Sequence, residues 1–160
     1  MRTMIRVLSI LLLIGMVAGV AAAAQRHWVG TGTGNGRFWD RTANWSATQG
    51  GAGSAGVPTA ADDVFIDGGG RTEINVNAVC LSFTQTDPGH TTDFRVATTL
   101  TIGTGGFSLT NGSFNTDVSN TVNVAGPWSV TGGSFIPGTG TINLNGSAAQ
   151  SIITNAAFYN

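Results

Sequence analysis

A short phrase of alternating polar and apolar residues occurs three times between Thr99 and Asn160, and it restricts the fold more than any other feature. Each copy opens on a threonine and closes on a phenylalanine: Thr99 to Phe114, Thr121 to Phe135, and Thr141 to Phe158. The opening threonines are 22 and then 20 residues apart. Alternation with a period of two is typical of β-strands, and a fixed period of about 20–23 residues is typical of solenoids. The repeat therefore predicts an all-β fold, a parallel β-solenoid, with a right-handed β-helix as its expected form.

One copy of the phrase cannot fold alone, because its few large apolar side chains do not offset the entropy of ordering about 20 residues. Stacking removes this difficulty, since each rung pairs its strands with the next and shares its core. Aromatic residues recur at equivalent repeat positions: Phe107 and Trp128, then Phe114, Phe135 and Phe158. We expect them to stack inside the coil, because they alternate with serine and threonine. The alternative is an outer aromatic ladder that binds sugar rings.

The first 24 residues have the pattern of a secretory signal peptide. Arg2 and Arg6 form a positive start, Val7 to Val20 is an apolar run, and Ala21 to Ala24 supplies small residues before a cleavage site at Gln25. The apolar run is short for a permanent membrane helix, although a retained single-helix anchor is the alternative. Export to the cell surface or the extracellular space is therefore expected.

The charge of the remaining chain is low. It has five arginines, eight acidic residues and no lysine, which gives a formal charge of −3. Nucleic-acid or anionic-membrane partners require clustered positive charge, so neither is expected. Cys80 is the only cysteine, and it lies in an apolar run. The apolar run predicts that the thiol of Cys80 is buried. Because there is a single cysteine, an intrachain disulfide is excluded.

The residues after the leader divide into two parts. Residues 25–73 contain three of the four tryptophans between glycine-rich loops and have no copy downstream, so they predict an aromatic cap over the first strands. Residues 74–160 hold the solenoid repeats, which we expect to continue beyond Asn160. The glycines of Gly30 to Gly36 do not form a phosphate-binding loop motif.

Several short phrases resemble the start of large secreted bacterial β-strand-repeat proteins, similar to autotransporter passengers and filamentous adhesins. They are Trp28-Val29-Gly30, Phe38-Trp39-Asp40, Asn44-Trp45-Ser46, Val57-Pro58 and Asp62-Asp63-Val64-Phe65, and, in the repeat, Gly140 to Ser147, Gln150 to Ile152 and Phe158 to Asn160. The resemblance implies a pectin-lyase-like β-helix on a surface or secreted protein. It supplies no catalytic motif.

Candidate sites for chemistry are few, and no catalytic or cofactor-binding residue is predicted. Asp62, Asp63 and Asp67 form the densest acidic group, and they could hold calcium or act in a turn. His90, in an Asp-Pro-Gly turn, is expected to be solvated, and His27 is expected on the cap surface. Arg71, Arg95 and these histidines are the available bases for a lyase reaction.

The sequence thus predicts a noncatalytic, exported structural or adhesive β-solenoid module. Two alternatives remain: the N-terminal part of a carbohydrate-active β-helix enzyme similar to polysaccharide lyases, and a carbohydrate- or calcium-binding module. Extracellular glycans, host or cell surfaces, and further rungs of the same parent chain are the expected partners.

Overall fold

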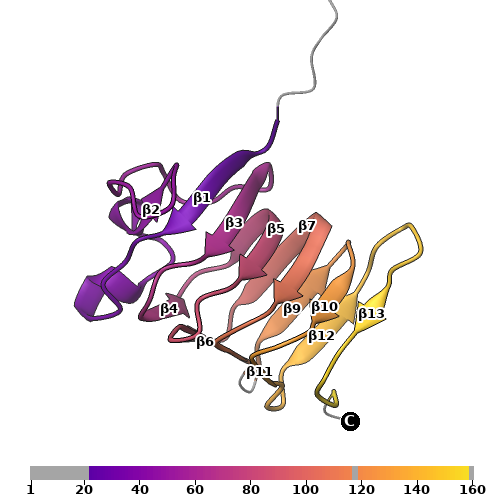
Figure 1. Cartoon of the computed structure of the whole chain (residues 1–160). Coiled ribbons are helices and arrows are strands. Elements are labelled where there is room, and N and C mark those ends of the chain that lie inside the picture. The colour runs from indigo at the N-terminus through magenta and orange to yellow at the C-terminus, as the bar shows by residue number, and fades with distance from the viewer. Residues whose placement is uncertain (1–21, 117–118, 159–160) are drawn as a thin grey trace, which may run out of the picture.

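The chain forms a parallel β-solenoid of about four turns (Figure 1). The computed structural model describes residues 22–116 and 119–158. Most of the predicted signal peptide lies outside these residues, and only Ala22, Ala23 and Ala24 are described. The predicted all-β class and solenoid architecture are confirmed.

Thirteen strands and two short 3₁₀ helices make up the described chain. In order they are β1 (Ala24–Trp28), η1 (Gly34–Arg37), η2 (Thr42–Asn44), β2 (Trp45–Ser46), β3 (Asp62–Ile66), β4 (Arg71–Ile74), β5 (Ala78–Gln85), β6 (Thr91–Phe94), β7 (Thr99–Leu109), β8 (Ser113–Asn115), β9 (Thr121–Val124), β10 (Trp128–Val130), β11 (Ser134–Ile136), β12 (Thr141–Leu144) and β13 (Ile152–Ile153). Among the described residues, no helix is long and apolar enough to cross a membrane.

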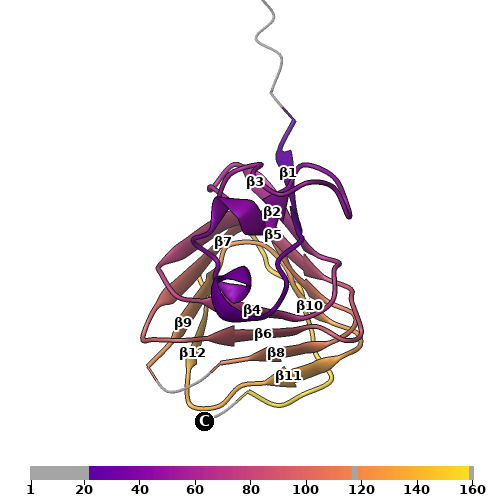
Figure 2. The same cartoon turned by 90° about the vertical axis from the view of Figure 1, so that its left-hand side faces the viewer.

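The strands form two sheets that wrap around one interior. The larger sheet follows the path β12-β9-β7-β5-β3-β1-β2, and β10 and β13 join it through the second half of β7. The smaller sheet has the order β11-β8-β6-β4. Among the strands of residues 22–116 and 119–158, only β1 and β2 pair in antiparallel fashion. Figure 2 looks along the stack and shows β4, β6, β8 and β11 closing one side of the coil.

The register of the strands follows the sequence repeat. Thr99, Thr121 and Thr141 lie side by side on β7, β9 and β12, and Phe114 pairs with Phe135. The apolar residues of the repeated phrase face inward on β9, where Val122 and Val124 are buried and alternate with half-buried polar residues. The repeat period therefore equals one turn of the coil, which confirms its interpretation as a rung.

The aromatic repeat positions form an internal stack. The rings of Phe107 and Trp128 lie parallel, 4.2 Å apart, and both are buried. Phe114 meets Phe107 edge-on at 4.8 Å, and Phe158 packs against Phe135 at 5.9 Å. The interpretation as core is confirmed, and an outer aromatic ladder of these residues is excluded.

The N-terminal end of the stack is covered by β1, β2, η1 and η2, which lie across the mouth of the coil in Figure 2. Trp28, Trp39 and Trp45 are all buried there. The indole Nε1 of Trp45 donates to the carbonyl of Trp39 at 2.8 Å. The side-chain amide of Asn44 donates to two loop carbonyls and so fixes the path of the chain.

The parallel stack begins earlier than the predicted boundary between residues 73 and 74. β3 pairs in parallel with β5, so it belongs to the solenoid although it lies within residues 25–73, and β4, which pairs with β6, spans the predicted boundary. β1 extends the same sheet by pairing in parallel with β3. The cap is thus continuous with the stack, because its first strand forms part of the sheet that it covers.

Candidate functional site

The structure separates the three aspartates that were predicted to hold calcium. Asp62 points inward from β3, where it accepts hydrogen bonds from the backbone N and the Oγ1 of Thr59 and pairs with Arg26 at 3.2 Å. Asp63 points outward on the same strand and accepts from the hydroxyl of Ser82.

Asp67, beyond the end of β3, pairs with His27 instead. Its Oδ2 lies 2.6 Å from the Nδ1 of His27. Among the described residues, no group of three or more His, Cys, Asp or Glu side chains could hold a metal ion. The geometry of the described residues therefore gives the predicted calcium site no support.

The His27–Asp67 pair is part of the cap. The imidazole of His27 stacks on Phe65 with 4.8 Å between ring centres, and its Nε2 lies 3.3 Å from the Oε1 of Gln25. His27 is buried, in contrast to the predicted place on the cap surface. Both ring nitrogens have protein partners, so the pair ties β1 to the end of β3.

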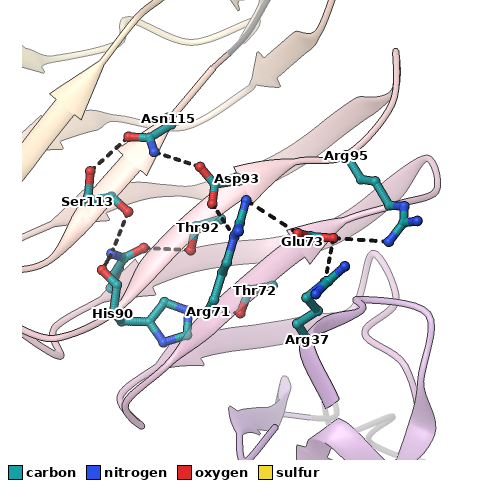
Figure 3. Close-up of polar contacts among 11 residues, drawn as sticks. Arg37, Arg71, Thr72, Glu73, His90, Thr92, Asp93, Arg95, Ser113 and Asn115 are labelled. Carbon is teal, nitrogen blue, oxygen red and sulfur yellow. Dashed lines mark hydrogen bonds and ion pairs between the residues drawn. The ribbon is translucent and has the colours of Figure 1, made fainter. Parts of the chain in front are cut away.

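The densest group of charged side chains lies on the outer face of β4, β6 and β8 (Figure 3). We call this group, Arg37, Arg71, Glu73, Asp93, Arg95 and Asn115, the arginine–carboxylate ladder. Figure 3 shows Glu73 between three guanidinium groups. Its Oε2 lies 2.9 Å from Arg37 and 3.5 Å from Arg95, and its Oε1 lies 3.3 Å from Arg71.

Asp93 continues the ladder on the next strand. Its Oδ2 accepts from the Nε of Arg71 at 2.7 Å, and its Oδ1 accepts from the side-chain amide of Asn115 at 2.6 Å. Each of the four carboxylate oxygens of Glu73 and Asp93 thus lies within 3.5 Å of a protein nitrogen. Arginine neighbours stabilise the ionised form of these carboxylates, so proton uptake or metal binding would have to compete with the existing ion pairs.

Sequence reasoning missed this ladder, although a signal for it existed. Arg71 and Asp93, Glu73 and Arg95, and Asp93 and Asn115 are each 22 residues apart. This spacing is the rung period, so a charge and its partner fall side by side on adjacent strands. Arg37 could not be found in this way, since it comes from η1 in the cap.

The arginines are the accessible part of the ladder. The side chains of Arg71 and Arg95 are 48 % and 47 % exposed, whereas that of Glu73 is 7 % exposed. Two guanidinium groups lie over the ring of Phe38, with Arg95 4.7 Å and Arg37 5.2 Å from its centre. Three arginines face two carboxylates, so the outer surface of the ladder is positive.

His90 is buried inside the coil, so the prediction of a solvated turn histidine is wrong. Its Nδ1 lies 2.7 Å from the carbonyl of Gly68, to which it must donate, and its Nε2 accepts from the hydroxyl of Thr72 at 2.9 Å. Burial lowers the pKa of His90, and the Gly68 carbonyl, Asp87 and Asp93 oppose this shift in part. His90 is therefore a neutral core side chain.

Gln85 completes this interior polar network. Its Nε2 donates to the carbonyls of His90, Asn111 and Ser113, and its Oε1 accepts from the hydroxyl of Thr92 at 2.8 Å. Gln85 is fully buried. The network satisfies buried backbone groups where the coil turns between its two sheets.

Cys80 is buried on β5, which confirms the predicted environment of this thiol. Burial, and to a smaller degree the nearby Asp63 carboxylate, raises the pKa of Cys80 strongly. A thiol that stays protonated is a poor nucleophile. Cys80 therefore acts as a small core side chain.

No family model, curated protein or solved structure matches the chain. The candidate site thus has to be judged from its own geometry. Its ionisable groups are either in the core, as Cys80 and His90 are, or engaged with one another in the ladder.

Proposed function

We propose that the chain is a noncatalytic structural module of an exported protein, in which the β-solenoid acts as a stalk or an adhesive scaffold. One observation carries this proposal: the side chains best suited to chemistry are used to hold rungs together. Each carboxylate oxygen of Glu73 and Asp93 lies within ion-pair or hydrogen-bond distance of a protein nitrogen, and Cys80 and His90 are buried. The export part of the proposal rests on the leader-like residues 1–24.

The proposal is tested against lyase activity on acidic polysaccharides. The purified protein is incubated with polygalacturonate and with alginate, with and without calcium, while the absorbance of unsaturated uronates is followed. No product is expected. Turnover that is lost in an Arg71→Gln or Arg95→Gln variant, but kept in Arg41→Gln, would overturn the noncatalytic proposal and place a base on the ladder.

Calcium binding has a separate test. Because Asp62, Asp63 and Asp67 each have other partners, millimolar calcium should leave the melting temperature unchanged. A stabilisation that saturates with calcium and disappears in Asp67→Asn would show that the third hypothesis, a calcium-binding module, is correct.

A second function, the binding of an acidic glycan, is favoured by the excess positive charge of the ladder. Arg71 on β4 and Arg95, directly after β6, are about half exposed, and both lie near Glu73. Their guanidinium groups keep donors free for a bidentate contact with a carboxylate. Calorimetric titration with oligogalacturonate should then give binding that weakens in Arg95→Gln and with added salt. Equal binding of a neutral glucan would exclude this function.

A further inference from the structure

The side-chain amide of Gln25 lies against the imidazole of His27. Both residues are on β1, two positions apart, so their side chains share one face of the strand. The Nε2 of His27 lies 3.3 Å from the Oε1 of Gln25. An amide oxygen only accepts hydrogen bonds, so this contact directs a hydrogen of the ring to Oε1.

The imidazole is held from its other side as well. Its Nδ1 lies 2.6 Å from the Oδ2 of Asp67, and its face stacks on Phe65 with 4.8 Å between ring centres. His27 is buried, whereas Gln25 is exposed. A donor that the protein fixes in this way is preorganised, because the ring does not have to be ordered when the amide reacts.

Gln25 is also the residue that follows the expected cleavage site of the leader-like segment. Cleavage after Ala24 makes the α-amine of Gln25 the N-terminus of the exported chain. The rest of β1 keeps its neighbours, because Gln25, Arg26 and His27 pair with β3, and His27 and Trp28 pair with β2. An N-terminal glutamine carries both a nucleophilic amine and an amide carbon that this amine can reach by closing a five-membered ring.

We propose that Gln25 of the exported chain closes to pyroglutamate and that His27 promotes this step. The α-amine nitrogen attacks the Cδ of the same residue, and the Nε2 of His27 donates to Oε1 as negative charge develops on that oxygen. The bond between Cδ and the amide nitrogen then breaks, and this nitrogen leaves as ammonia with the proton that the amine gives up. Asp67 is a positioning residue, which occupies Nδ1 and so turns Nε2 towards Gln25.

This inference rests on the export part of the proposed function and adds a modification site to it. The reaction occurs once, on the chain's own N-terminus, so it is compatible with a noncatalytic module. Its product is a neutral lactam. The lactam removes the positive charge of the N-terminus and leaves no free amine for an aminopeptidase.

The test uses the chain with its leader, expressed in a bacterium that exports proteins and has no glutaminyl cyclase. Intact-mass spectrometry should show a product that begins at Gln25 and lacks the mass of one ammonia. The loss of ammonia is then followed with time in freshly exported protein, both folded and in guanidinium chloride. The folded protein should cyclise at least about tenfold faster than the denatured protein.

Two variants assign this acceleration, each measured below its own melting temperature. His27→Phe keeps a ring on Phe65 but has no donor, so its folded rate should fall to that of the denatured parent. Asp67→Asn should also slow cyclisation, by at least about threefold, because its amide still accepts from Nδ1 but carries no charge. Arg26→Gln is the matched control, since neighbouring side chains on a strand point to opposite faces, and it should cyclise like the parent.

Equal rates in the folded and the denatured parent would overturn the proposal. So would a rate like the parent's in either His27→Phe or Asp67→Asn. An exported chain that begins at Gln25 and keeps an open amine would overturn cyclisation while leaving export intact. A product that begins at any other residue would overturn both this inference and the predicted cleavage site.

Discussion

Replacement of Gln85 by leucine tests whether the interior polar network stabilises the coil or is merely tolerated. Gln85 stands in a column of inward residues whose other members are aliphatic: Ile66, Leu109 and Val130. Leucine therefore fits the column in size and character. A purely apolar column would be expected to gain stability from this change.

The hydrogen bonds of Gln85 predict the opposite result. Gln85→Leu removes the acceptor of the Thr92 hydroxyl and the donor shared by three carbonyls. Each buried polar group left without a partner costs about 1–3 kcal/mol, whereas the additional apolar burial returns about 1 kcal/mol. The expected net loss in the free energy of unfolding is about 1–3 kcal/mol.

A double-mutant cycle with Thr92→Val isolates the contact. Thr92→Val alone should cost about 1 kcal/mol, the net value of one hydrogen bond. The loss in free energy of unfolding should be about 1 kcal/mol smaller in the double variant than the sum of the two single losses. With both side chains replaced, neither is left as a polar group that has lost its hydrogen-bond partner. Thr101→Val, on the exposed face of β7, should change stability by less than about 0.5 kcal/mol and serves as the control.

Urea unfolding followed by tryptophan fluorescence measures these values. Equal m-values are required, so that the change is in stability and not in the unfolded state. A Gln85→Leu variant as stable as the parent would refute the reasoning. If the losses in free energy of unfolding from the two substitutions simply add, the Gln85–Thr92 hydrogen bond is refuted.

Three other perturbations test the stack. Trp128→Ala should cost about 3–5 kcal/mol, since it empties the space between Phe107 and Phe135; a loss below 1 kcal/mol in urea unfolding would contradict the internal stack. The depressed pKa of His90 predicts that stability is fully present above the unfolded value of about 6.5 and declines as the pH falls below it. Urea midpoints between pH 7.5 and 5.5 should show this slope, and His90→Gln should reduce it; an unchanged slope would contradict the buried neutral imidazole. Gly106→Ala should destabilise by at least about 2 kcal/mol in thermal melts, because φ is +81° and a Cβ would lie 2.4 Å from the Pro127 carbonyl oxygen; a melt like the parent's would contradict this close approach.

The architecture could be predicted from the sequence because the repeat determines both alternation and register. Thr99, Thr121 and Thr141 recur at the period of one turn, and the structure places them side by side. The same alternation predicted that the aromatic side chains of the repeat point into the coil. Even the contact between the side chains of Asn123 and Asn143, at 3.1 Å, follows from their equivalent repeat positions.

The boundary of the stack could not be predicted in this way. β3 and β4 carry no recognisable copy of the phrase, yet they pair in parallel with β5 and β6. Backbone pairing requires only an extended chain of the right length, so a rung can be built from residues that do not repeat. Sequence repetition thus marks only the regular part of the solenoid.

The candidate site was hidden for two different reasons. Partners within the ladder, such as Glu73 and Arg95, are one rung apart and could have been found by comparing charges at the repeat period. The burial of His90 could not have been found from the repeat period, because it depends on the path of the turn between β5 and β6. The adjacent aspartates Asp62 and Asp63 were grouped by their closeness in sequence, but neighbours on a strand point to opposite faces.

Hydrogen exchange resolved by segment tests most directly that the chain is a stack of paired rungs. The amides of β5 and β7, which pair with strands on both sides, should exchange slowest. Those of the exposed loop residues 47–50 should exchange much faster. Equal exchange in β5, β7 and this loop would contradict the stack.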